Sequence, residues 1–314
     1  MKENWGIIGH EKIIDFLDSS LKNNQLTHAY FFTGLPNLGK TLVAEEFAKR
    51  ILGSQAAWNL DVTKLEINEE NSEILIEQAH EWRRSLFLKP FSGQRKIGLI
   101  YGAENLNEAS GNSLLKIIEE PAEGTIILIV ASGADSVLST IISRSQVIKF
   151  LPVKEETIAS ALAIRLGGDK KVIVKAAEAA MLSAGRPGIA IKLLEDKKFF
   201  NAIKRYREVA EKIFFEDKAE FWPIAEKLLK SQEGFIGKGR EVLAVAEQLE
   251  ILIHRALLVD YGLDQAEKTA AENLQMRRFN GGFTSALSLI NSAKRDLSHN
   301  VQPKLILENL FINL

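Results

Sequence analysis

The chain has 314 residues, and its 40 Lys and Arg nearly balance its 41 Asp and Glu. The formal net charge of −1 excludes a strongly basic nucleic-acid-binding protein, so any contact with nucleic acid has to be local. The lack of cysteine excludes disulfides, thiolate zinc sites and a cysteine nucleophile, and it favours a reducing cytoplasm. The apolar runs are no longer than strands, so neither a membrane span nor a signal peptide is expected.

The first half of the chain alternates strand and helix signals. Strands are expected at residues 29–33, 62–67, 96–101, 125–131 and 147–150. Helices are expected around Leu17 and at residues 42–50, 72–84 and 112–119. Continuous apolar strands separated by helices predict an α/β fold, with a parallel sheet that helices cover on both faces.

The pattern changes after Pro152, where strand signals end. Helical periodicity predicts a small three-helix unit at residues 155–165, 169–183 and 187–194, followed by five or so longer helices. Helix breaks are expected at Gly234, Gly237 and Gly239, and again at Gly281-Gly282. Three domains are therefore predicted, with the ranges 1–152, 153–195 and 196–314.

A phosphate-binding loop follows the first strand and opens the next helix. Residues 34–41 match G-x-x-x-x-G-K-T at every fixed position, in the strand–loop–helix context that this motif needs. The backbone N–H groups would wrap the phosphates, Lys40 would reach the outer phosphates, and Thr41 would ligate magnesium. ATP or ADP with Mg²⁺ is the expected ligand, and the alternative is a loop that only turns the chain. The predicted binding residues are Gly34, Leu35, Pro36, Asn37, Leu38, Gly39, Lys40 and Thr41.

The strand at residues 96–101 lacks the acid that an ATPase needs at its end. An Asp for the magnesium shell and an acid to polarise water are expected there, but the chain has Tyr101 and Gly102. Glu104 is close in sequence, and we favour a surface carboxylate over a catalytic role for it. The sequence thus predicts a protein that holds a nucleotide and cleaves it weakly or not at all.

Other charged groups have ordinary explanations when they are judged from residue chemistry alone. Arg144, in Ser143-Arg144-Ser145, is a solvated or salt-bridged surface group; the alternative is an arginine finger for a neighbour's phosphates. The five histidines show no spacing typical of metal ligands. A solvated face is favoured over DNA contacts for the basic residues Arg83, Arg84, Lys89, Arg95 and Lys96.

Several segments, in order along the whole chain, resemble the bacterial clamp-loader family of AAA+ proteins. Residues 112–121 are similar to the motif N-A-L-L-K-x-L-E-E-P with Ser113 in place of Ala, and residues 140–145 resemble T-I-x-S-R-C with Ser145 in place of Cys. The other matching segments are residues 8–10, 28–34 and 297–308.

Within this family the chain is more similar to the delta-prime branch than to the gamma/tau ATPases. Gamma/tau members carry Asp-Glu where Tyr101 and Gly102 stand, a sensor Arg where Gly188 stands, and zinc-binding cysteines. Delta-prime members commonly keep an Asp at the Gly102 position, which is also missing here. No zinc is expected.

The resemblance implies an AAA+ nucleotide-binding domain at 1–152, a helical lid at 153–195 and a helical collar at 196–314 that drives assembly. It implies that Ile8 and Gly9 join the nucleotide site and that Arg144 acts in trans as an arginine finger. The implied role is a cytoplasmic subunit of the DNA polymerase III holoenzyme that helps load the sliding clamp onto primed DNA. Gamma/tau and delta subunits, the sliding clamp and primer-template DNA are the implied partners.

Three alternatives stay open at this point. The first is a gamma/tau-like ATPase subunit, and the second is an AAA+ interaction module with a vestigial phosphate loop. The third, a P-loop kinase, is the least supported because no second substrate-binding motif is found.

Overall fold

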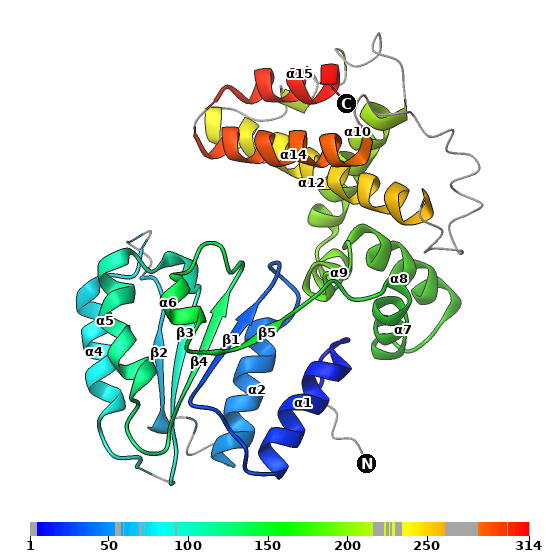
Figure 1. The fold of residues 1–314 in the computed structure, drawn as a ribbon. Coiled ribbons are helices and arrows are strands. Elements are labelled where there is room, and N and C mark those ends of the chain that lie inside the picture. Colours follow the sequence, from blue (N-terminus) through cyan, green and yellow to red (C-terminus); the bar gives the residue numbers. More distant parts are fainter. Residues whose placement is uncertain are drawn as a thin grey trace. The chain divides into compact units, whose positions relative to one another are not determined.

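A computed structural model provides the fold (Figure 1). It describes residues 5–53, 58, 60–68, 71, 73–91, 93–215, 223, 226, 228–229, 234–260, 282–299 and 301–313. Two compact units, residues 1–194 and 195–314, are each described by themselves. In the described part of the chain, no helix is both long and apolar enough to cross a membrane.

The first unit is built on a parallel sheet of five strands in the order β2-β3-β4-β1-β5. The strands are β1 (Ala29–Thr33), β2 (Val62–Leu65), β3 (Lys96–Tyr101), β4 (Thr125–Ala131) and β5 (Gln146–Lys149). The five expected strands and their parallel arrangement are therefore confirmed. Strand β1 lies between β4 and β5 and pairs with both of them, so it is an interior strand of the sheet.

Alternate side chains of the central strands β1, β3 and β4 build the hydrophobic core on the two faces of the sheet, as the pleat requires. On β1, Phe31 joins the core on the side of α4 (Ile76–Leu86) and α5 (Glu108–Glu119). Tyr30 and Phe32 join the core on the side of α1 (Glu11–Lys22) and α2 (Lys40–Leu52). Figure 1 shows these two helix pairs on opposite faces of the sheet.

Helices α4 and α5 each begin four residues away from the expected start. Helix α4 begins later, because Ile74 pairs with Leu106 in an isolated β-bridge and is thereby kept extended. Helix α5 begins earlier, because the side chain of Asn107 accepts a hydrogen bond of 2.9 Å from the N–H of Ser110 and caps the helix. Both starts depend on contacts that hydrophobic periodicity does not report.

Shorter elements complete the first unit. A 3-10 turn η1 (Ala103–Asn105) follows β3, and α6 (Ser139–Ile142) precedes β5. The three expected helices after Pro152 are present as α7 (Glu155–Arg165), α8 (Lys170–Leu182) and α9 (Pro187–Glu195). Their small core, which includes Ile158 and Leu162, also takes in the partly buried Ile8. These helices belong to the same compact unit as the sheet, and the division at residue 152 stays a prediction.

The described part of the second unit is helical. Its longer helices are α10 (Lys197–Phe215), α12 (Gly234–Asp260), α14 (Gly282–Ser298) and α15 (Pro303–Asn313), which share one core. On α12, Ala246, Leu249 and Leu252 are buried in that core. Leu243, on the same helix, is 36% exposed.

The expected helix breaks at Gly237 and Gly239 are wrong, because α12 continues through both residues. A glycine inside a helix costs about 1 kcal/mol relative to alanine. Burial of the same helix against α10, α14 and α15 outweighs that cost. Gly234 and Gly282 do stand at helix starts, each with positive φ, whereas Gly281 lies outside the described residues.

A buried carboxylate joins α10 to α12. Glu241 accepts hydrogen bonds from Arg205 Nη2 at 2.8 Å and from the Tyr206 hydroxyl at 2.9 Å. Burial, reinforced by Glu241, raises the pKa of Tyr206, so the phenol stays protonated and keeps donating. Both carboxylate oxygens are thereby satisfied inside the protein.

Gly98, in the middle of β3, makes room for helix α4. A Cβ at this position would lie 2.5 Å from Trp82 Cζ2 and 2.9 Å from Leu86 Cδ1. Trp82 is itself fixed, because its indole N–H donates to the Thr63 carbonyl at 3.1 Å. The close approach of α4 to the sheet therefore depends on the missing side chain.

We predict that Gly98→Ala lowers the free energy of unfolding by about 1–3 kcal/mol through overpacking. Gly133→Ala is the control, because its Cβ would approach only Ser136 Oγ, at 3.8 Å. Urea denaturation of both variants measures the difference. Equal stability of Gly98→Ala and the unsubstituted protein would contradict the packing described.

Candidate functional site

The phosphate-binding loop lies between the carboxyl end of β1 and the first turn of α2. It uses left-handed backbone at Asn37, with φ of 65°, and at Gly39, with φ of 95°. Gly34 has a φ of 140°, and a Cβ there would lie 2.4 Å from the carbonyl oxygen of Phe150. Only glycine fits at Gly34, because the loop is pressed against the segment that leaves β5.

Lys40 folds back over this loop. Its Nζ donates to the carbonyl oxygens of Gly34 at 2.6 Å and Leu35 at 2.7 Å, and only 7% of the residue is exposed. Burial lowers the pKa of Lys40, and the negative charge of Glu104 partly opposes that effect. An ammonium group has three N–H donors, so two hold the loop and the third can meet an oxygen of a bound phosphate.

Thr41 offers a hydroxyl at the start of α2. The residue is exposed, and its hydroxyl has no partner among the described residues. Hydroxyl oxygen is an acceptable ligand for Mg²⁺, so the residue fits the predicted role. No group of three or more His, Asp or Glu that could hold a metal is found in the part of the chain that the structure describes. A magnesium ion would therefore need phosphate oxygens and water besides Thr41.

Tyr101 ends β3 in the position where an ATPase would carry an acid. Its hydroxyl donates to Glu45 Oε1 on α2 at 2.7 Å, and the Lys64 ammonium lies 5.5 Å from the ring centroid. Burial, together with Glu45, raises the pKa of Tyr101, so the phenol stays neutral. A neutral phenol committed to Glu45 neither ligates magnesium nor activates water.

The Glu104 carboxylate is fixed in place by hydrogen bonds within the protein. Its carboxylate accepts hydrogen bonds from the Ser132 N–H, 3.2 Å to each oxygen, and from the Ser132 hydroxyl at 2.5 Å. Ser132 directly follows β4, so the contact lies at the carboxyl ends of two neighbouring strands. Glu104 is half-buried and its charge reaches Lys40. Glu104 is therefore a surface carboxylate that the fold holds in place, and its expected lack of a catalytic role stays a prediction.

The segment before α1 touches the loop from another side. The His10 Nε2 is 2.9 Å from the carbonyl oxygen of Leu38, so this nitrogen carries the donated proton. A Cβ on Gly9 would lie 2.6 Å from Val153 Cγ1, and Ile8 packs on the core of the three helices. Ile8 and Gly9 thus lie beside the loop, and their contact with a nucleotide stays a prediction.

Helix α9 meets the loop at Gly188. The Gly188 N–H donates to the Asn37 carbonyl at 2.9 Å, and a Cβ would lie 3.1 Å from both the Cβ and the carbonyl oxygen of Asn37. Any side chain here would force the loop to move. The position where gamma/tau proteins are expected to carry a sensor Arg therefore offers only a backbone contact.

Arg144 lies near the amino ends of the strands, opposite to the phosphate-binding loop at their carboxyl ends. It precedes β5, whereas the loop follows β1, and these two strands are parallel neighbours. It lines a pocket of about 420 Å³ with residues that precede β1, among them Thr27 and His28. The structure therefore brings the loop residues together and keeps Arg144 apart from them.

Arg144 forms a close ion pair with Glu119, the last residue of α5. The expectation of a salt-bridged, partly exposed Arg agrees with this contact, and the finger alternative remains compatible with it. Sequence reasoning missed Glu119, Ser132 and the bond from His10 to Leu38. Glu119 lies inside the motif at residues 112–121, which is the signal that could have identified it.

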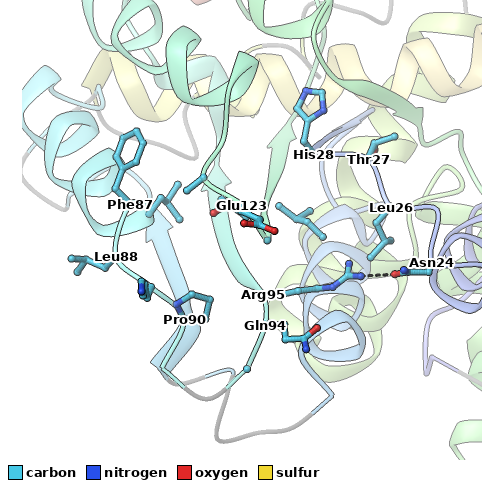
Figure 2. Close-up of a pocket in the computed structure, with 17 residues that line it drawn as sticks. Asn24, Leu26, Thr27, His28, Phe87, Leu88, Pro90, Gln94, Arg95 and Glu123 are labelled. Atoms are coloured by element: carbon cyan, nitrogen blue, oxygen red, sulfur yellow. Dashed lines mark hydrogen bonds between the residues drawn. The ribbon is translucent and has the colours of Figure 1, made fainter.

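A larger hollow, of about 870 Å³, lies at the amino ends of the strands (Figure 2). It contains none of the predicted loop residues. Figure 2 shows Arg95 donating to Asn24 Oδ1, at 2.6 Å, beside this hollow. Lys96 is buried and donates to the Leu88 carbonyl at 3.3 Å, so it does not belong to the solvated face expected for the basic residues.

Comparison with known proteins finds relatives among the subunits of DNA polymerase III. Residues 9–154 match the family model described as "DNA polymerase III, delta subunit". Over 171 residues the chain is 30% identical to subunit tau/gamma of Haemophilus influenzae, covering 50% of this chain and 25% of that protein. Over 101 residues it is 35% identical to subunit delta' of the same organism, covering 32% and 30%. The first unit is related to these DNA polymerase III subunits.

The relationship has a defined extent. The chain spans 25% of the tau/gamma relative and 46% of the gamma subunit of Buchnera aphidicola. A DNA polymerase III gamma subunit-related protein of Thermotoga maritima matches at a TM-score of 0.51 and 19% identity, covering 94% of this chain and 97% of that one. At this identity the likeness concerns the fold alone. The expected fold class, an α/β AAA+ module with a helical C-terminal part, is confirmed.

We predict that His10 makes the first unit sensitive to acid. Burial lowers the pKa of His10 below its ordinary 6.5, although the bond to Leu38 and the charge of Glu11 oppose the shift. As pH falls below 6.5, the unfolded chain therefore takes up this proton before the folded chain does, and stability is lost. Above that pH the contribution is fully present.

His10→Asn tests this, because Asn tolerates the φ of 64° found at this residue. Between about pH 7 and about pH 5 the melting temperature of the variant should fall less than that of the unsubstituted protein. Parallel melting curves for the two proteins over this range would refute the assignment.

Proposed function

We propose that the chain is a delta-prime-like clamp-loader subunit of the replicative DNA polymerase III holoenzyme. It binds a nucleotide and hydrolyses it weakly or not at all. The observation that carries this proposal is the contrast between Lys40, held over a formed loop, and Tyr101, bonded to Glu45 where an acid is needed. The relatives among delta' and gamma/tau subunits support it.

The binding half of the site is complete in this proposal. The N–H groups of the loop and the first turn of α2 would bind the phosphates, and Lys40 would donate its remaining N–H to a phosphate oxygen. Thr41 and the phosphates would hold Mg²⁺, which would neutralise phosphate charge. Ile8 and Gly9 border the nucleotide from the segment before α1.

Arg144 acts on another subunit. Within one chain, strand β1 separates Arg144 from the loop, so its cation serves a phosphate that a neighbour brings. A planar guanidinium offsets the charge that develops during phosphoryl transfer, and no acid in its own chain is required.

Assembly follows from the second unit. We assign residues 196–314 to the collar that joins this chain to gamma/tau and delta subunits, because their helices form a core separate from the sheet. The complete assembly places the sliding clamp on primer-template DNA, and its location is the cytoplasm.

The alternative functions make different use of the same residues. A gamma/tau-like ATPase would need Glu104 to replace the missing acid. The Glu104 carboxylate is held by Ser132, and its negative charge acts on the Lys40 ammonium. The matches to gamma/tau subunits support this alternative. A module with a vestigial loop would bind no nucleotide at all.

We predict that the purified chain binds ADP or ATP with turnover near background. Lys40→Ala should weaken binding about 10–100-fold, the loss expected for one charge-assisted contact, whereas the exposed Lys12→Ala should leave it unchanged. Isothermal titration measures binding, and phosphate release measures turnover. Turnover typical of an AAA+ ATPase that Lys40→Ala abolishes would favour the gamma/tau alternative. No binding at millimolar nucleotide would favour the vestigial loop.

We predict that Arg144→Ala lowers the DNA- and clamp-stimulated ATPase of the reconstituted complex. One site should lose about a thousandfold in rate, and the total should fall less because the other sites use other subunits' arginines. Arg144→Lys should rescue poorly, since Lys lacks the planar fork.

The exposed Arg165→Ala is the matched control, and melting temperatures should hardly change because a partly exposed ion pair contributes at most about 1 kcal/mol. Unchanged ATPase and clamp loading with Arg144→Ala would make it an ordinary surface residue.

A further inference from the structure

The guanidinium of Arg144 is held along two of its edges. Nε donates to Glu119 Oε1 in the close ion pair, and Nη1 donates to the Thr140 carbonyl at 2.9 Å and to Ser143 Oγ at 3.3 Å. A guanidinium has five N–H donors. The Nη2 group is thus left without a partner in the part of the chain that the structure describes.

The position of Glu119 is set by the core. Helix α5 begins at the Asn107 cap and buries Leu114, Ile117 and Ile118 against the sheet. Glu119 follows these buried residues directly, so its carboxylate comes from a fixed helix end and not from a loop. Thr140 and Ser143 come from the short α6 and its end, which hold the opposite side of the same guanidinium.

The Arg144 side chain is partly exposed beside a pocket. The Arg144 side chain is 35% exposed and lines the pocket of about 420 Å³, together with Glu119, Ser143 and Ser145. An oxygen from outside the chain can therefore reach Nη2 without breaking the contacts of Nε and Nη1. Two N–H groups on one nitrogen suit phosphate oxygens, which accept several hydrogen bonds.

We infer that Glu119 is a positioning residue, which fixes the Arg144 guanidinium so that its Nη2 edge meets a phosphate of a neighbouring subunit's nucleotide. This inference rests on the proposed finger role of Arg144. A free Arg side chain loses rotamer entropy when it docks on a phosphate. Because the ion pair already orders the Arg144 side chain, this entropy cost of docking is smaller. The Glu119 carboxylate also fixes the plane of the guanidinium. A lysine in place of Arg144 has no planar group that could be oriented in this way.

The opposite role would have an opposite effect. If Glu119 withheld Arg144 from the phosphate, its removal would raise the stimulated ATPase. If it positions Arg144, its removal lowers the rate and leaves nucleotide affinity unchanged, because the finger acts on the transition state.

The experiment uses the reconstituted complex with gamma/tau-type ATPase subunits, delta and the clamp from the same organism. The variants are Glu119→Ala, Glu119→Gln, Arg144→Ala and the double variant Glu119→Ala with Arg144→Ala. Glu120→Ala is the matched control, since this neighbouring exposed carboxylate takes no part in the pocket. Melting temperatures confirm that each variant folds.

Glu119→Ala should lower kcat at the site served by Arg144 about tenfold, with KM unchanged. Glu119→Gln should keep part of the rate, because its amide oxygen still accepts from Nε. In the Arg144→Ala background, Glu119→Ala should have no further effect.

The outcomes separate this inference from the finger role itself. A loss with Arg144→Ala but none with Glu119→Ala overturns the positioning role alone, and so does a gain with Glu119→Ala. An additional loss in the Arg144→Ala background also overturns it, because Glu119 would then act by another route. Full rates with Arg144→Ala overturn the finger role and the positioning role together.

Discussion

Strand β1 fixes the separation between the two candidate sites. Gly34 continues from its carboxyl end, and Thr27 and His28, at its amino end, share a pocket with Arg144. A strand rises about 3.3 Å per residue, so the five residues of β1 place roughly 15 Å of buried backbone between the loop and the Arg144 pocket. A nucleotide on the loop and the guanidinium of the same chain cannot meet. Any action of Arg144 on phosphate therefore needs a second molecule.

The Lys40 ammonium holds the phosphate-binding loop in shape without a ligand. A buried ammonium is costly unless oxygen atoms surround it, and here the carbonyls of Gly34 and Leu35 supply them. Glu104 adds a compensating charge from the end of β3. The loop is thus shaped by interactions within the protein, and under the proposed function a phosphate would meet a loop that is already formed. Cleavage asks for a different element, an acid beside the attacking water, and Tyr101 is committed to Glu45 instead.

Local features were predictable from the sequence, and contacts between distant segments were not. The phosphate loop occupies eight contiguous residues whose conformation follows from its glycines, and the strands follow from apolar runs. The Glu119–Arg144 pair spans 25 residues, and the Glu104–Ser132 contact spans 28. Each depends on how helices and strands pack, which periodicity alone does not fix. Local glycine signals also misled at Gly237 and Gly239, where burial of a long helix outweighs backbone preference.

Three segments hold the loop by its backbone. The carbonyl of Asn37 accepts from Gly188, that of Leu38 accepts from His10, and Gly34 lies against Phe150. The first two contacts link the loop to helix α9 and to the segment before α1. Under the proposed function, a nucleotide that stiffens the loop would also stiffen these two segments. Such coupling uses binding energy and needs no hydrolysis. A subunit that presents a cation to its neighbour gains from rigidity in its own fold, because a displaced guanidinium stabilises nothing. Under the proposed function, a formed loop without a catalytic acid would meet that demand.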